Sequence, residues 1–260
     1  MEATTWLQSR KADEGFTLIE LSIVLVIIGL IVGGILVGQD MIRGAEIRAT
    51  VAQLEKLNSA VNTFRNKYNG APGDLLNPTN FGFTARTSNG DGLLQSCTGE
   101  GGAAEAKMLI GCADKFFWND LSAASLISES FTDVSGAAAL ATLPAPFSTY
   151  FPQAKTGPGT YIMVWASGGL NYFFLHGITS ITLGVPVLNN ALTPITAFQI
   201  DTKMDDGVAG TGSVQGNDAT DGTPNSLGSG AALCATGGAY NTTGVTATTP
   251  LCGLQIRTSF

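Results

Sequence analysis

The chain has 260 residues, of which 44% are hydrophobic and only 13% are charged, and its formal net charge is -7. It has no cluster of Lys and Arg, so we expect no nucleic-acid partner, because phosphate binding needs clustered cations. The 33 glycines and the low charge favour one loop-rich extracytoplasmic domain with an anchor over a cytosolic enzyme.

An apolar run extends over residues 16–38, with Glu20 as its only charged residue. At 1.5 Å per residue, a helix of about 22 residues spans a hydrocarbon core of about 30 Å. A secretory signal peptide is the alternative, but the run is too long for one and no small-residue cleavage site follows it. We therefore predict a membrane-spanning helix, in which a lone carboxylate costs several kcal/mol.

Residues 39–69 carry an apolar stripe at helical spacing, flanked by charged residues. The stripe consists of Ile47, Val51, Leu54, Leu57, Val61, Phe64 and Tyr68. No proline interrupts residues 16–71, so the membrane span and the amphipathic stretch are predicted to form one helix of about fifty residues. The helix is expected to end at Asn69 and Gly70, before Pro72.

The segment "GFTLIELSIVLVIIGLIVGG" resembles the N-terminus of type IV pilins and of the pseudopilins of type II secretion systems. The resemblance implies that residues 1–15 are a leader, which a prepilin peptidase removes between Gly15 and Phe16. It also implies that Phe16 is then N-methylated and that Glu20 directs assembly. The apolar run lacks the proline that many major pilins carry there, which favours a pseudopilin or a minor subunit.

A physical argument gives Glu20 the same role. Cleavage would expose an α-amine on Phe16, one helical turn before Glu20, and this amine can pair with the carboxylate of its own or of another copy. In hydrocarbon such pairing fixes the axial offset of two subunits. The alternative is that Glu20 lies at the level of the lipid headgroups and has no role in assembly.

These observations predict a non-enzymatic structural subunit of a type IV pilus or related filament. The alternatives are a minor pseudopilin of a type II secretion system and a membrane-anchored extracytoplasmic binding domain. The expected partners are other pilin-like subunits, the prepilin peptidase, an inner-membrane assembly platform and membrane lipid. We expect a single pass through the inner membrane, with the globular domain in the periplasm or outside the cell, and location in a pilus or pseudopilus after assembly.

Residues 70–260 are predicted to form the globular domain of an α+β fold. Helices are expected within residues 105–127 and a β-hairpin at 160–166 and 171–178. Further strands are expected at 180–185, 196–201 and 252–260, whereas residues 205–250 are expected to be mostly loop. The strands should form an antiparallel sheet against the amphipathic half of the long helix.

Four cysteines, all beyond the apolar run, predict two disulfides in an oxidising compartment. Three connectivities exist, and we expect the local one, Cys97 with Cys112 and Cys234 with Cys252. A zinc site is disfavoured, because there is no CxxC pair and His176 is the single histidine.

Two acidic turns are candidate calcium loops. Asp201, Asp205 and Asp206 in "DTKMDDG" are candidate calcium ligands, and "TSNGDG" at residues 87–92 is a second candidate. Neither matches a complete EF-hand, and ordinary Asp-Gly and Asn-Gly turns are the alternative. No other cofactor is expected. His176 lies within an apolar run and is expected to be a packed strand residue, and no nucleophile-elbow or P-loop motif is present.

Overall fold

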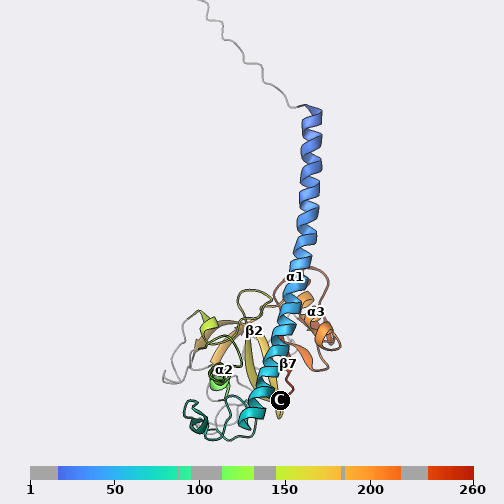
Figure 1. The fold of residues 1–260 in the computed structure, drawn as a ribbon. Coiled ribbons are helices and arrows are strands. Elements are labelled where there is room, and N and C mark those ends of the chain that lie inside the picture. The colour runs from blue at the N-terminus through green and yellow to red at the C-terminus, as the bar shows by residue number, and fades with distance from the viewer. Residues whose placement is uncertain (1–16, 87, 95–112, 132–144, 183–184, 218–233) are drawn as a thin grey trace, which may run out of the picture. The chain divides into compact units, whose positions relative to one another are not determined.

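The computed structural model describes residues 17–86, 88–94, 113–131, 145–182, 185–217 and 234–260, and it confirms the α+β class (Figure 1). Two compact units are present, Met1–Gly44 and Ala45–Phe260, and helix α1 (Leu18–Tyr68) contributes residues to both. The other elements are η1 (Pro78–Phe81), α2 (Ala113–Ala123), η2 (Phe147–Thr149), β1 (Thr160–Ser167), β2 (Leu170–Thr182), β3 (Val185–Asn189), α3 (Pro194–Met204), β4 (Val214–Asn217), β5 (Ala235–Thr236), β6 (Ala239–Tyr240), η3 (Val245–Thr248) and β7 (Gly253–Arg257).

Helix α1 is continuous for 51 residues, as the absence of proline predicted. Its C-terminus also follows the prediction. Asn69 adopts the left-handed conformation with φ 55°, and its amide donates to the carbonyl of Arg65 at 2.8 Å. This conformation satisfies a carbonyl at the end of the helix and turns the chain away from the helix axis.

The second half of α1, residues 45–68, belongs to the hydrophobic core of the Ala45–Phe260 unit, and residues 18–44 are its first half. Five residues of the predicted stripe are buried, and Val51 and Tyr68 are partly buried against the same core. The buried five are Ile47, Leu54, Leu57, Val61 and Phe64. They share one core cluster with Ile162 of β1, Phe173 of β2 and Leu254 of β7. Burial of each large apolar side chain contributes roughly 1.5–3 kcal/mol, so this face fixes the helix to the domain.

The sheet has five antiparallel strands, in the order β1-β2-β7-β4, with β3 paired to β2. The predicted hairpin is confirmed, because Ser167 pairs with Leu170 across a two-residue turn. Gly168 and Gly169 both have positive φ, 56° and 76°, as a type I′ turn requires. Strand β2 runs on to Thr182, beyond the predicted end of the hairpin.

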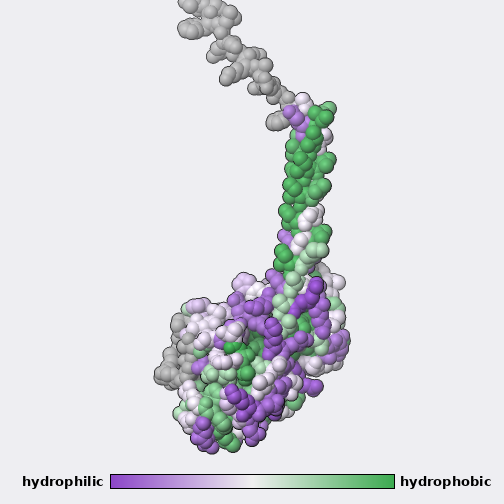
Figure 2. Space-filling model, in the orientation of Figure 1, coloured by the Kyte–Doolittle hydropathy of each residue, from purple (hydrophilic) through white to green (hydrophobic). Residues whose placement is uncertain are grey.

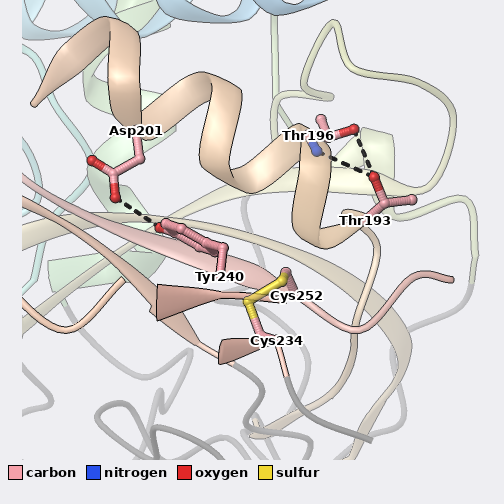
Figure 3. The surroundings of a disulfide bond; sticks show 6 residues. All are labelled: Thr193, Thr196, Asp201, Cys234, Tyr240 and Cys252. Atoms are coloured by element: carbon pink, nitrogen blue, oxygen red, sulfur yellow. Dashed lines mark hydrogen bonds between the residues drawn. A yellow bond between two sulfur atoms is a disulfide. The ribbon is translucent and has the colours of Figure 1, made fainter. Parts of the chain in front are cut away.

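One predicted strand is wrong. Residues 196–201 lie in helix α3 instead, because the preceding Thr193 and Pro194 form a helix start (Figure 3). The Thr193 hydroxyl accepts the Thr196 amide at 3.2 Å, and proline is favourable in the first helical turn. Ala197 and Ile200 then face the core at helical spacing.

The other two regions differ less from expectation. Helix α2 occupies part of the predicted helical region, whose residues 105–112 lie outside the described ranges. The expected loop at 205–250 also contains the short strands β4, β5 and β6.

Candidate functional site

The first turn of α1 is closed by a reciprocal pair of side chains, Thr17 and Glu20. The Glu20 carboxylate accepts the Thr17 amide at 2.8 Å and the Thr17 hydroxyl at 2.7 Å, while the Glu20 amide donates to that hydroxyl at 3.3 Å. This is a capping box, in which two backbone amides at a helix start are satisfied by side chains. Both residues are exposed in the single chain.

The capping box is a role for Glu20 that our sequence analysis missed. The signal was present, because "TLIE" is a Thr followed three residues later by Glu at the start of an apolar helix. The Thr17 groups that bind the Glu20 carboxylate are neutral, however, and none of the described residues forms an ion pair with it. The Thr17 cap therefore does not neutralise the charge of Glu20.

After this turn, α1 carries no charged residue from Leu21 to Gly38. Its most apolar stretch of eighteen residues is not buried by any described part of the chain, and the helix is long and apolar enough to cross a membrane. Figure 2 shows this part of the helix as hydrophobic along its visible face. An uncharged helix exposed on all sides requires an apolar environment from outside its own chain.

Comparison with known protein families identifies the N-terminal segment. Residues 10–36 match the family model of the prokaryotic N-terminal methylation motif. Residues 10–36 are a prepilin-type signal of type IV pilins and pseudopilins. No curated protein and no solved structure matches the chain.

The prepilin-type signal confirms the resemblance stated from the sequence. It supports a type IV pilin-like protein or a pseudopilin, a class that is structural and non-enzymatic in general. It also implies processing by a prepilin peptidase, assembly with other pilin subunits and anchoring in a membrane. Gly15 and Phe16, the predicted cleavage site, lie outside the described residues.

One of the two predicted disulfides is present. Cys234 bonds to Cys252, across a sequence separation of 18, and links the start of β5 to the start of β7 (Figure 3). Both cysteines are buried. The two cysteines of the other expected disulfide, Cys97 and Cys112, lie outside the described residues.

The three predicted calcium ligands come together at the end of α3. Asp201, Asp205 and Asp206 each place a carboxylate oxygen within 4.8 Å of the others. Asp201 is buried, and the phenol of Tyr240 donates to it at 2.9 Å (Figure 3). Asp205 and Asp206 are exposed. Convergent carboxylate oxygens are the ligands that Ca²⁺ prefers.

Hydrogen bonds already occupy much of this acidic cluster. Asp205 accepts the amides of Ser213 and Val214, and these bonds lower the pKa of its carboxyl. Burial raises the pKa of Asp201, against the hydrogen bonds from Tyr240 and the Gly207 amide. The cluster therefore fits a cation through its free lone pairs, and it is also consistent with an ordinary hydrogen-bonded turn.

The second candidate calcium loop is organised around Asp74, a residue our sequence analysis missed. The buried Asp74 carboxylate accepts the Gly90 amide at 3.1 Å and the Gly92 amide at 2.8 Å. Burial raises the pKa of Asp74, and the two amide bonds oppose this. Within the loop, the Leu93 amide donates to Asp91 at 2.8 Å. In the described part of the chain, Asp91 joins no group of three candidate metal ligands.

His176 is a fully buried residue of β2, as predicted. Its ring stacks on Phe174 with centroids 4.4 Å apart. The neighbouring strand approaches so closely that a Cβ on Gly253 would lie 1.7 Å from His176 Nε2, so only glycine fits there. Burial lowers the pKa of His176 to about 3, and the imidazole is therefore neutral in the folded domain.

Proposed function

We propose that the chain is a structural, non-catalytic subunit of a type IV pilus or a related filament. One observation carries the proposal: the prepilin-type signal continues directly into an apolar helix that none of the described residues of its own chain covers. Such a helix suits storage in a bilayer first and packing against other helices later.

In this proposal the peptidase cuts between Gly15 and Phe16, and the new N-terminus on Phe16 is methylated. The mature subunit remains in the inner membrane by a single pass, with Ala45–Phe260 in the periplasm, until an assembly platform extracts it into the filament. Glu20 selects the position of the incoming subunit, because its carboxylate is most stable in hydrocarbon beside the Phe16 amine of a neighbour.

A minor pseudopilin of a type II secretion system is the second candidate. The absence of proline from residues 16–38 favours it, because the resembled major pilins often carry one there. Both candidates use the same signal and the same assembly chemistry. A membrane-anchored binding domain, by contrast, would use the helix only as an anchor and would not need the charge on Glu20.

We also propose that Asp201, Asp205 and Asp206 hold a calcium ion that stabilises the loop after α3. The convergence of the three carboxylates supports this assignment. Bound Ca²⁺ would offset the mutual repulsion of the carboxylates.

The capping box makes it possible to test charge and capping separately at Glu20. Glu20→Gln keeps an acceptor for the Thr17 amide but removes the charge, whereas Glu20→Val removes both. We expect both variants to be processed and inserted, and both to reduce the yield of sheared filaments on the order of a hundredfold, since several kcal/mol of pairing is lost. Wild-type yield from Glu20→Gln would refute a role for the charge.

Processing is measured on the same membrane fractions. Intact-mass analysis of the wild-type chain should show loss of residues 1–15 and addition of one methyl group at Phe16. Persistence of the full-length chain in cells that contain the peptidase would contradict the proposal.

A further inference from the structure

An open pocket of about 440 Å³ lies within the Ala45–Phe260 unit. It is bounded by the second half of α1, by the segment after α2 and by the segment before β1. Its apolar lining includes Leu57, Leu126, Ile127 and Pro152, and Lys56 and Lys155 belong to the same lining. A pocket of this size holds a large apolar side chain together with a neighbouring polar group.

The charge of this pocket differs from that of the chain. The chain has a net charge of -7, whereas the pocket presents two exposed lysines and one glutamate. Among the described residues, the ammonium groups of Lys56 and Lys155 have neither an ion-pair partner nor a hydrogen-bond partner. Glu129 accepts the Ser128 hydroxyl at 3.0 Å. The pocket is therefore suited to an apolar group that carries a negative charge.

The chain itself offers such a group on α1. Met41 lies between the charge-free run, which ends at Gly38, and Ile47, the first buried residue of the helix. Its side chain is 71% exposed. Asp40, directly before it, is exposed and has no ion-pair partner in the described residues. At about 100° per residue, Met41 lies about 100° and Gly44 about 40° around the helix axis from Asp40. The three residues therefore fall within about 100° of the helix circumference.

Their chemistry matches the pocket. A methionine side chain is flexible and fills irregular apolar space. The adjacent carboxylate carries the charge opposite to that of the two lysines, and the glycine allows a close approach of the helix backbone.

We propose that the occupant of the pocket is a second copy of this chain, which inserts Met41 and places Asp40 beside Lys56 and Lys155. This inference rests on the proposed function, because only a filament subunit needs such a contact. Each copy carries both Asp40 and Met41, in the Met1–Gly44 unit, and the pocket, in the Ala45–Phe260 unit. Contacts of this heterologous kind repeat from copy to copy without closing, as filament growth requires.

A charge reversal and its rescue test the contact in cells that assemble the filament. The variant Lys56→Glu with Lys155→Glu should reduce sheared filaments about tenfold, and Asp40→Lys alone should do so as well. Combining the three changes should restore most of the yield, because the attraction is then reversed but present. Arg65→Glu is the matched control, since it reverses an exposed cation of α1 that does not line the pocket.

Two results would overturn the contact: a wild-type yield from the lysine reversal, or no recovery in the triple variant. An unchanged melting temperature of each variant in detergent excludes misfolding as the cause of a loss. If the wild-type chain forms no filaments, the proposed function fails together with this inference. If it forms filaments that the reversals do not affect, only this inference fails.

Crosslinking locates the contact directly. Copies carrying Met41→Cys are expressed together with copies carrying Ile127→Cys, and oxidation of intact filaments should give a disulfide-linked dimer. The described native cysteines are both consumed in the Cys234–Cys252 bond and do not compete. Pairing Met41→Cys with Arg65→Cys is the control. Equal dimer yields from the two pairs, or no dimer from the first, would contradict insertion of Met41 into the pocket.

Discussion

The two halves of helix α1 have the same backbone but bury their side chains in opposite ways. In the first half, the large hydrophobic residues are all exposed, from 49% at Val24 to 88% at Leu18. In the second half, Leu54, Val61 and Phe64 are completely buried. Both halves carry large apolar side chains, so the hydrophobicity of a side chain alone does not determine its burial.

The distribution of apolar residues around the helix explains the difference. A stripe at steps of three and four can be covered by a domain on one side, and the sheet of the Ala45–Phe260 unit supplies that cover. A segment that is apolar on all sides cannot be covered by one domain, so it requires a bilayer or several other helices. The second half of α1 therefore stabilises the fold of the domain, whereas the first half is left for a bilayer or for other helices.

The sharpest test of this division truncates one apolar side chain in each half. Phe64→Ala should lower the free energy of unfolding of the domain by about 4 kcal/mol, because it leaves a cavity in a close-packed core. Leu30→Ala should leave the stability of the domain unchanged. Denaturation of the mature full chain in detergent, followed by the fluorescence of the buried Trp118 and Trp165, measures both. Equal losses would mean that the two halves are not distinct.

This division could be predicted from the sequence, because it depends on spacing within a single helix. The long helix, its end at Tyr68, its buried stripe and the Gly168–Gly169 hairpin all follow from local rules of periodicity and capping. Residues 196–201 have the β-propensity of a strand, but the helix start at Thr193 and Pro194 outweighs it and places them in α3. Short apolar runs do not distinguish a strand from a helix by pattern alone.

The candidate sites were predicted to different degrees. The prepilin-type signal and the convergence of the three aspartates depend on residues close together in the sequence, and they were found. Asp74 bonds the amides of Gly90 and Gly92, and Tyr240 bonds Asp201, across 16 to 39 residues. Such pairs are brought together by the tertiary fold, and one sequence without tertiary information does not show them.

Acid provides a second test of the division between the two halves of α1. The buried His176 belongs to the domain, so its titration should affect the stability of the domain and not that of the first half of α1. Its pKa is lowered from 6.5 to about 3, so the folded domain binds fewer protons than the unfolded chain between these pH values. The stabilisation is fully present above pH 6.5 and is lost as the pH falls towards 3. At pH 5 the expected loss is about 2 kcal/mol relative to neutral pH.

The variant His176→Gln isolates this effect. Burial raises the pKa of Asp74 and of Asp201, so these two groups act in the opposite direction as the pH falls. The comparison is therefore the difference in pH dependence between wild type and His176→Gln, from denaturation midpoints at pH 7 and pH 5. An identical pH dependence in the two proteins would show that His176 does not limit acid stability.

Calcium should also act on the domain and not on the first half of α1. Millimolar Ca²⁺ should stabilise the domain by about 1 kcal/mol through mass action, if the three aspartates bind it with the affinity of an extracellular site. Asp206→Asn should abolish this increase, whereas Asp91→Asn in the other acidic turn should preserve it. Thermal melting with calcium and with chelator measures the shift. The same melting temperature in both conditions would leave the three residues as a hydrogen-bonded turn.

The smallest effect is expected in the capping box, at the start of α1. Thr17→Ala removes the hydroxyl that accepts the Glu20 amide, which costs about 0.5 kcal/mol at an exposed helix start. Thr17→Ser retains a hydroxyl and is the matched control. Amide hydrogen exchange in the first turn should accelerate two- to threefold in the alanine variant, while the stability of the domain should not change. Because the charge of Glu20 remains, filament yield should fall far less than in Glu20→Gln, provided that intact mass shows normal removal of the leader. The opposite result, loss of filaments in Thr17→Ala with normal assembly of Glu20→Gln, would mean that the first turn acts through its cap and not through its charge. The first half of α1 would then depend on local helix stability, whereas the second half depends on the core of the domain.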